Sequence, residues 1–268
     1  MRIALGLEYD GTHYAGWQIQ PESHLVTTLQ GCLEAAVSTV ADSPVPVVCA
    51  GRTDAGVHAL QQTVHFSPTV YRPLHAWMRG VNGNLPKTMV VRWVRAVDDQ
   101  FHARHSAMSR RYTYVLMSKP TRPALACQQA GWTHLPLNLS LMQQAAQLLL
   151  GEHDFSTFRA SECQARTPVR TVQLIEIVQR GQVFFITAQA NAFLHHMMRN
   201  IVGALVYVGS GRWSLGDFTA AFAAKDRKQG APTFMASGLY FCGASYDASF
   251  DLPVPVVISP EAHWPWGH

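Results

Sequence analysis

The octet Gly51-Arg52-Thr53-Asp54-Ala55-Gly56-Val57-His58 places one carboxylate in a stretch that has a glycine near each end. An apolar run, residues 45–49, precedes the octet, and an alternating run, residues 62–66, follows it, so we expect a loop between two strands. A reactive carboxylate there needs a tight backbone, which the two glycines permit, and a nearby cation to keep it ionised. Arg52 could be that cation. The alternative is an ordinary β-turn in which Asp54 makes local backbone hydrogen bonds.

The composition describes a globular protein with room for one large domain or two modest ones. The chain has 268 residues, of which 48% are hydrophobic and 14% are charged, which excludes a disordered protein. The longest apolar run, residues 201–208, is far too short to cross a membrane, and the N-terminal residues lack the pattern of a signal peptide. We therefore expect a cytoplasmic protein without a membrane segment.

The charge is mildly basic, with a formal net charge of +4. Arginine greatly outnumbers lysine, and because a guanidinium group binds phosphate oxygens with two hydrogen bonds and stacks on bases, this choice suits an RNA partner. A GC-rich coding bias would produce the same excess of arginine whatever the function, so composition leaves both explanations open.

Nothing in the sequence indicates a metal or a nucleotide cofactor. The five cysteines are scattered, and no pair has the spacing of a zinc site or a redox motif. There is no Walker loop, no dinucleotide fingerprint and no His-Glu-x-x-His pattern, and on a helix the neighbouring His195 and His196 would point in different directions. We predict that the protein uses neither kind of cofactor.

Periodicity predicts a mixture of helices and strands. Apolar residues recur at helical spacing after Thr28, Pro73 is placed to open a short helix that ends near Val81, and residues 193–208 form the longest helix candidate. Residues 169–189 read as a hairpin around Arg180-Gly181. Because strands come in neighbouring antiparallel pairs with helices between them, the pattern favours an α+β fold with helices on one face of a mainly antiparallel sheet.

Further segments accompany the octet in a fixed order along the chain. They are YDGTHYAGWQ (9–18), FHAR (101–104), RRYTY (110–114), GEHDF (151–155), NAFLHHMMRNIVG (191–203) and GLYF (238–241). Together with the octet, these segments resemble the tRNA pseudouridine synthase A family, and the resemblance extends from Arg2 to about Leu252. It implies two similar α/β halves around a central RNA-binding cleft. We place the N-terminal half, with the Asp54 loop, at residues 1–104, the C-terminal half at 105–250, and a Pro- and Trp-containing tail at 251–268.

The resemblance also implies an activity. Members of this family isomerise uridine to pseudouridine on the 3′ side of the tRNA anticodon arm, as homodimers and without a cofactor. The catalytic aspartate of the family falls on Asp54, and the tyrosine that stacks on the flipped-out base falls on Tyr112. From its position alone, Tyr112 could instead be a sheet aromatic whose hydroxyl group lies at the surface.

Other site residues follow from the same resemblance. Arg52 corresponds to the arginine that takes the place of the flipped base, although it could equally form an ion pair with Asp54. Arg199 corresponds to an arginine that pairs with the catalytic carboxylate, and Leu239 to an apolar residue against the base; the alternatives are a solvated helix charge and a core leucine. RNA affinity is expected from arginines near the cleft, namely Arg104, Arg110, Arg111, Arg159, Arg166 and Arg170.

Two other functions fit parts of the pattern. An RNA-binding protein that retained the fold and lost the activity would not need Asp54, Arg52 and Tyr112 together. A hydrolase of N-glycosidic bonds would need a second acid to protonate the leaving group, and no paired acidic motif accompanies Asp54.

Overall fold

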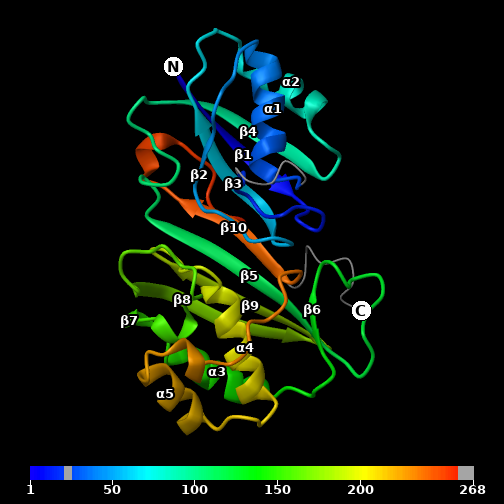
Figure 1. Cartoon of the computed structure of the whole chain (residues 1–268), viewed down its shortest axis with the longest axis vertical. Coiled ribbons are helices and arrows are strands. Elements are labelled where there is room, and N and C mark those ends of the chain that lie inside the picture. The colour runs from blue at the N-terminus through cyan, green and yellow to red at the C-terminus, as the bar shows by residue number, and fades with distance from the viewer. Residues whose placement is uncertain (21–25, 259–268) are drawn as a thin grey trace. The chain divides into compact units, whose positions relative to one another are not determined.

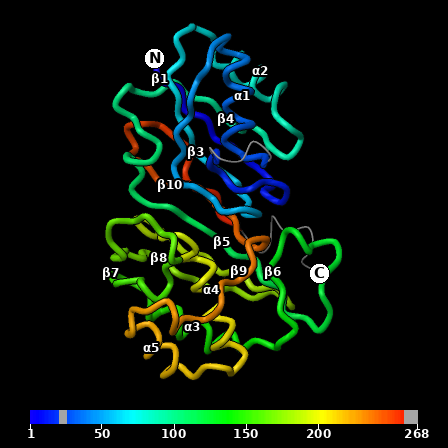
Figure 2. Tube along the Cα trace, viewed as in Figure 1, coloured from blue at the N-terminus to red at the C-terminus, as the bar shows by residue number. Residues whose placement is uncertain are grey.

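The computed structural model describes residues 1–20 and 26–258, which form two compact units. The first unit contains Met1–Arg110 and Tyr240–Val257, and the second contains Arg111–Leu239 together with Ile258. The chain passes between the units near the start of strand β5 (Ser109–Ser118) and again at the start of strand β10 (Leu239–Ser245). In Figures 1 and 2, orange β10 therefore lies among the blue and cyan strands of the first unit.

The strands of the first unit follow the path β4-β1-β3-β10. Their bounds are β1 (Arg2–Tyr9), β2 (Val48–Cys49), β3 (His58–Phe66) and β4 (Met89–Val97), with β10 completing the path. β1 is antiparallel to both β3 and β4, and β2 adds a short antiparallel pairing on β3. β10 pairs with β3 in parallel, and this pairing explains why a C-terminal segment belongs to the N-terminal unit.

Two helices, α1 (Leu29–Ala41) and α2 (Leu74–Asn84), cover this part of the first unit. The helix expected after Thr28 is confirmed, since the Thr28 side chain accepts a hydrogen bond from the backbone of Gly31 and caps α1. The short helix expected after Pro73 is also present, and it continues three residues beyond Val81 to Asn84. α2 packs against α1 and β4, which buries Trp77 completely.

The strands of the second unit follow the path β5-β9-β8-β7. Besides β5, they are β6 (Gly131–Thr133), β7 (Gly151–Asp154), β8 (Val169–Arg180) and β9 (Val183–Ala190), with β6 paired in parallel to β5. β8 and β9 form the expected antiparallel hairpin, with Arg180 opposite Val183 and Gly181 at a positive φ of 56°.

The helices of the second unit are α3 (Leu139–Gln147), α4 (Met197–Gly209) and α5 (Leu215–Ala223). α3 packs against α4, α5 and β8. The expected helix over 193–208 begins four residues late, because His196 has a left-handed backbone (φ 59°) and the preceding residues form a turn from Leu194 to Met197. None of the helices in the described part of the chain is long and apolar enough to cross a membrane.

The predicted fold class is confirmed: within residues 1–20 and 26–258, five α-helices accompany strands that pair mostly in antiparallel fashion. The central cleft stays a prediction. Of the expected C-terminal tail, residues 259–268 lie outside the described residues. The described part is tied to the first unit, since the Gln61 side chain donates hydrogen bonds to the carbonyl oxygens of Pro253 and Val254, and Val256 N–H donates to Cys242.

Candidate active site

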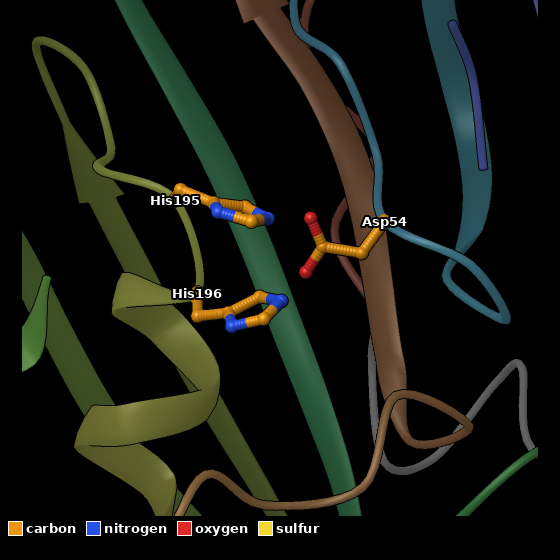
Figure 3. A group of neighbouring side chains, drawn as sticks. All are labelled: Asp54, His195 and His196. Carbon is orange, nitrogen blue, oxygen red and sulfur yellow. The ribbon is translucent and has the colours of Figure 1, made fainter. Parts of the chain in front are cut away.

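The octet forms a loop between β2 and β3, as the sequence predicts, and Figure 3 draws the Asp54 side chain on it. The β2–β3 pairing continues to Ala50, whose N–H donates to the Thr63 carbonyl oxygen at 2.8 Å, before the loop turns away. The Asp54 carbonyl oxygen then accepts a hydrogen bond from Val57 N–H at 3.2 Å, with Gly56 at a φ of 76°. A positive φ at the third residue of a β-turn favours glycine. This turn leaves the Asp54 side chain partly exposed.

The glycine- and aromatic-rich segment 10–20 supports this loop from inside the first unit. Trp17 N–H donates to the Thr53 carbonyl oxygen at 2.9 Å, and a Cβ atom on Gly16 would lie 2.9 Å from the same oxygen. The side chains of Trp17 and Tyr14 are buried, with exposed fractions of 2% and 7%. These two aromatics are therefore part of the core that supports the loop.

A buried hydroxyl pair fixes the residue before Asp54. The hydroxyl groups of Tyr9 and Thr53 lie 2.8 Å apart, and both residues are almost fully buried. Burial raises the pKa of Tyr9 well above its ordinary value, so this phenol stays neutral and acts as a hydrogen-bonding group. Thr53 is thus held through both its backbone carbonyl and its side chain, which restricts the position of the adjacent Asp54.

The last residue of the octet, His58, ties the other end of the loop to segment 10–20. Its Nδ1 atom lies 3.1 Å from the Gly11 nitrogen and 3.1 Å from Asp10 Oδ1, and its ring stacks on Tyr240 with centroids 4.8 Å apart. The hydrogen bond with His58 is the main cause that holds the pKa of Asp10 far below its usual range. His58 is only 3% exposed, which makes it a structural residue of the loop.

Arg52 lies on the solvent side of the same loop. Its side chain is exposed, and among the described residues no carboxylate lies within ion-pair distance of it. The Arg52 side chain is exposed and that of the next residue, Thr53, is buried. This is expected for an extended backbone, in which successive side chains point to opposite sides.

In the second unit, Tyr112 lies on β5 and is nearly buried, with an exposed fraction of 8%. Its ring packs edge-to-face against Phe193 with centroids 4.9 Å apart. Tyr114 is on the same face of the strand, as its period-2 spacing predicts, and its hydroxyl donates to the Met235 carbonyl oxygen at 2.9 Å. Tyr114 is fully buried and therefore structural, whereas Tyr112 keeps a small accessible surface.

Arg199 and Leu239 occupy different elements of the second unit. Arg199 is in the first turn of α4, where its Nε donates to the Phe234 carbonyl oxygen at 2.9 Å and its own carbonyl accepts from Phe234 N–H. The alternative of a fully solvated helix charge is therefore wrong for Arg199, because part of its guanidinium group is engaged with the backbone. Leu239 is the first residue of β10 and is 5% exposed.

His195 and His196, which Figure 3 also draws, precede α4 instead of lying on it. Their ring centroids are 4.0 Å apart. The expectation that the two side chains would point in different directions applies to a helix. Because α4 begins only after His196, whose φ is 59°, that condition is not met here, and Figure 3 shows both rings on the same side.

The six arginines that the sequence assigns to RNA binding fall into two groups. Four have guanidinium hydrogen bonds within the protein: Arg110 to Ala50 and Ala107, Arg111 to Gln189, Arg159 to Cys163 and Ala165, and Arg170 to Thr167 and Val169. Arg104 and Arg166 are exposed, and their side chains make no hydrogen bond or ion pair with a described residue. Only the second group has its full hydrogen-bonding capacity available to phosphates.

Comparison of the sequence with models of known protein families shows to which family the chain belongs. The family model described as "tRNA pseudouridine synthase" matches residues 7–106 and 145–247, which include the octet and most of the accompanying motifs. The chain belongs to the tRNA pseudouridine synthase family. The resemblance inferred from the motifs is thereby confirmed, and the protein is an isomerase.

Curated relatives agree over nearly the whole length of the synthase. "tRNA pseudouridine synthase A" of Dechloromonas aromatica (strain RCB) is 52% identical over 255 residues, which cover 95% of this chain and 96% of the relative. The protein of the same name from Nitrosomonas eutropha (strain DSM 101675 / C91 / Nm57) is 50% identical over 261 residues, covering 97% and 93%. A solved H/ACA RNP bound to a substrate RNA containing 2′-deoxyuridine matches with 12% identity and a TM-score of 0.38 over 76% of this chain and 44% of that chain, a similarity too low to support further conclusions.

The structure also reveals residues of the synthase that sequence reasoning missed. Sequence reasoning gave no individual role to Tyr9, in the segment 9–18, or to Gln62, in the alternating run 62–66, yet their side chains contact the octet directly. The available signal was the polarity of Gln62 and the neighbouring Gln61 and Thr63 within an otherwise apolar strand, since buried polar side chains need specific partners.

Proposed function

We propose that the synthase converts uridine to pseudouridine in the anticodon arm of tRNA and that Asp54 is its catalytic carboxylate. The reaction breaks the bond between ribose C1′ and base N1, turns the base, and forms a bond between C1′ and C5. The C5 proton is lost and N1 gains one, so no oxidant, reductant or phosphate donor is consumed. A carboxylate can act in such a transfer as a nucleophile or as a stabiliser of developing positive charge.

The position of Asp54 is the observation that carries this proposal. Its side chain is partly exposed, while the residue before it is fixed by Tyr9 and Trp17 and its own carbonyl closes a turn with Val57. A reactive group held on a restrained loop reaches its substrate with little loss of conformational freedom. A turn whose only purpose was to reverse the chain would not require so many buried contacts on one side.

Arg52 is proposed to occupy the place that the target base leaves in the RNA. Extruding a base from a stem costs a few kcal/mol, and a side chain that fills the gap offsets part of that cost. The exposed position of Arg52 and its lack of an ion-pair partner among the described residues favour this role over a structural pair with Asp54.

Tyr112, Arg199 and Leu239 are proposed to contact the extruded nucleotide. Stacking of a base on an aromatic ring is worth ~1–3 kcal/mol, which is comparable with the cost of extrusion. The edge-to-face packing of Tyr112 on Phe193 supports this role, because it fixes the ring plane before a base arrives. Arg199 retains donors beyond the one used on Phe234, since a guanidinium group has five N–H bonds.

The two groups of arginines are proposed to contribute to binding of the RNA backbone in different ways. Arg104 and Arg166 would bind phosphates directly. The remaining members, Arg110, Arg111, Arg159 and Arg170, would contribute positive charge while they hold the protein backbone.

The proposal includes a homodimer, a cytoplasmic location and a reaction that requires no metal or nucleotide cofactor. These features come from the family resemblance and from the chemistry, since the isomerisation is balanced without a co-reactant.

Tritium release from tRNA labelled at uridine C5, without added metal, tests the reaction class. The proposed isomerase releases tritium, and pseudouridine appears in the digested RNA in the same amount. A protein that only binds RNA releases none. A glycosidase gives free uracil and no pseudouridine, and either of these results would overturn the proposal.

A further inference from the structure

We infer that Gln62 is a positioning residue that fixes the catalytic loop, and that it acts on Asp54 through Gly51 and Thr53. This inference rests on the proposed role of Asp54. Gln62 lies on β3 and is completely buried, with an exposed fraction of 0%. A buried side-chain amide must satisfy its donors and its acceptor locally, so its partners are informative.

The first partner is the backbone of Gly51. In the β2–β3 ladder, Val48 pairs with His65 and Cys49 with Val64, and Ala50 N–H donates to Thr63, so Gly51 comes opposite Gln62 next. At this step a side chain replaces the main chain: Gly51 N–H donates to Gln62 Oε1 at 3.4 Å, and Gln62 Nε2 donates to the Gly51 carbonyl oxygen. The amide thus prolongs the ladder by one residue while the loop departs from the strand.

The second partner leads directly to the residue before Asp54. Gln62 Nε2 lies 3.5 Å from the Tyr9 hydroxyl oxygen, which lies 2.8 Å from the Thr53 hydroxyl. An amide nitrogen only donates, so the Tyr9 oxygen accepts from Gln62, and either hydroxyl group can be the donor in the hydrogen bond between Tyr9 and Thr53. Gln62 is therefore linked to Thr53 through the Tyr9 hydroxyl group.

These contacts hold both sides of Arg52. Gly51 is bound to Gln62, and Thr53 is bound to Tyr9 and to Trp17 N–H. The backbone between them cannot shift without breaking a buried hydrogen bond, so the exposed Arg52 and the adjacent Asp54 are presented in a fixed orientation. A displacement of about 1 Å in a catalytic group can reduce the rate by roughly 10²-fold.

The neighbouring Gln61 provides a matched control. It points to the opposite face of β3, is 6% exposed, and uses the same amide chemistry to bind the carbonyl oxygens of Pro253 and Val254. Gln61→Met and Gln62→Met remove equivalent buried amides from adjacent positions, but only the second removes contacts with the loop.

The experiment compares kcat, KM and tRNA affinity of these two variants with those of the wild type. We expect Gln62→Met to lower kcat by at least about 10-fold while the Kd for tRNA stays within about twofold, because the arginines that bind phosphate are unchanged. Gln61→Met should retain the wild-type kcat. Equal kcat values for the two variants would overturn the inference, and so would a parallel loss of kcat and tRNA affinity in Gln62→Met.

Gln62→Glu adds a readout that a purely structural role would not give. The introduced carboxyl group can donate to the Gly51 carbonyl oxygen or to Tyr9 only when it is protonated, and burial favours the protonated form. Its kcat relative to the wild type should therefore rise as the pH is lowered, whereas the ratio for Gln62→Met should not. A ratio for Gln62→Glu that is independent of pH would contradict the inference.

Two further variants keep the outcomes separate. If Gln62→Met does not fold, Tyr9→Phe removes only the hydroxyl that links Gln62 to Thr53, and a wild-type kcat in Tyr9→Phe would then count against the inference. Asp54→Asn is assayed in parallel. An active Asp54→Asn overturns the proposed catalytic role itself, while an inactive Asp54→Asn beside a fully active Gln62→Met overturns only the positioning role.

Discussion

Trp17 donates its main-chain N–H to the carbonyl oxygen of Thr53 at 2.9 Å, so the loop that carries Asp54 is bonded to a segment nearly forty residues earlier in the chain. The close contact between these two segments depends on Gly16. Its φ is 92°, and a side chain at this position would collide with the carbonyl oxygen of Thr53. Segment 10–20 is therefore best understood as the support of the proposed catalytic loop.

Gly16→Ala should impair both folding and turnover. Alanine in the left-handed region costs about 1–2 kcal/mol, and here its Cβ would also lie 2.9 Å from the Thr53 oxygen. We expect a loss of roughly 2 kcal/mol or more in the free energy of unfolding and a kcat at least about 10-fold lower. The control is Gly211→Ala, at a φ of 76° with no atom within 4 Å of the added Cβ, which should lose stability without losing kcat. Equal effects on kcat would contradict the supporting role.

Tyr112→Phe keeps the ring that packs on Phe193 and removes the hydroxyl group. If that hydroxyl assists removal of the C5 proton, kcat should fall by about 10²-fold or more while tRNA affinity is retained. Tyr207→Phe, on α4 beside Trp213, removes a hydroxyl elsewhere in the second unit and should leave kcat unchanged. An unchanged kcat in Tyr112→Phe would restrict this tyrosine to packing and stacking.

Substitutions in the two groups of arginines should affect different properties, the salt dependence of tRNA binding in one group and the stability of the fold in the other. Arg104→Gln and Arg166→Gln should each reduce the slope of log K for tRNA against log salt by about 1 and leave stability unaffected. Arg159→Gln should instead lower the free energy of unfolding by about 1–3 kcal/mol, because two backbone carbonyl groups lose their donor. Arg79→Gln, an exposed arginine on α2, shows whether any surface arginine has the same effect on the slope. Equal slopes for all four variants would refute this division.

His65 should make stability depend on pH. Burial, with the nearby charges of His102 and Arg2, lowers the pKa of His65 from 6.5 to about 4, and its Nδ1 accepts a hydrogen bond from Ala103 N–H at 3.1 Å. Between these values the unfolded chain binds more protons than the folded one, so this contribution to stability is present above pH 6.5 and is lost as the pH falls towards 4.

The variant His65→Asn retains an acceptor for Ala103 and does not titrate. The free energy of unfolding of each protein is measured with urea at pH 7.5 and at pH 5. On going to pH 5, the wild type should lose about 1–2 kcal/mol more of this free energy than His65→Asn. Background titration of carboxyl groups is common to both proteins and cancels in this comparison. A difference between the two proteins that is the same at both pH values would contradict the expected coupling.

Much of the fold could be predicted because local signals and tertiary contacts agree. The helix after Thr28 and the hairpin around Arg180-Gly181 were expected and are present, and in α5 the local signal is a capping box formed by Ser214 and Asp217. The start of α4 was predicted too early because the apolar spacing of residues 193–196 resembles a helix, while the left-handed conformation of His196 has no signal in the sequence. The return of β10 to β3 could not be predicted either, since a strand's composition does not specify its partner.

The candidate site could be located from its motifs but not assembled from them. The octet was singled out by its glycines and its carboxylate, and Tyr112 and Arg199 by resemblance. The contacts that support Asp54 depend on side chains whose partners are distant in sequence. Gln62 illustrates the reason: its role depends on lying opposite Gly51, and this register became visible only once β2 and β3 were paired. Likewise, no feature of the sequence distinguishes Arg159, which binds backbone carbonyl groups, from the exposed Arg166.

The most direct measurement is the amount of pseudouridine formed in a single turnover, with enzyme in excess over tRNA, by Asp54→Asn. Asp42→Asn is the control, because Asp42 ends α1 with a left-handed backbone that asparagine also adopts readily. We predict that Asp54→Asn binds tRNA with wild-type affinity and forms no pseudouridine, while Asp42→Asn forms as much as the wild type. Formation of pseudouridine by Asp54→Asn at a rate close to that of Asp42→Asn would contradict the account.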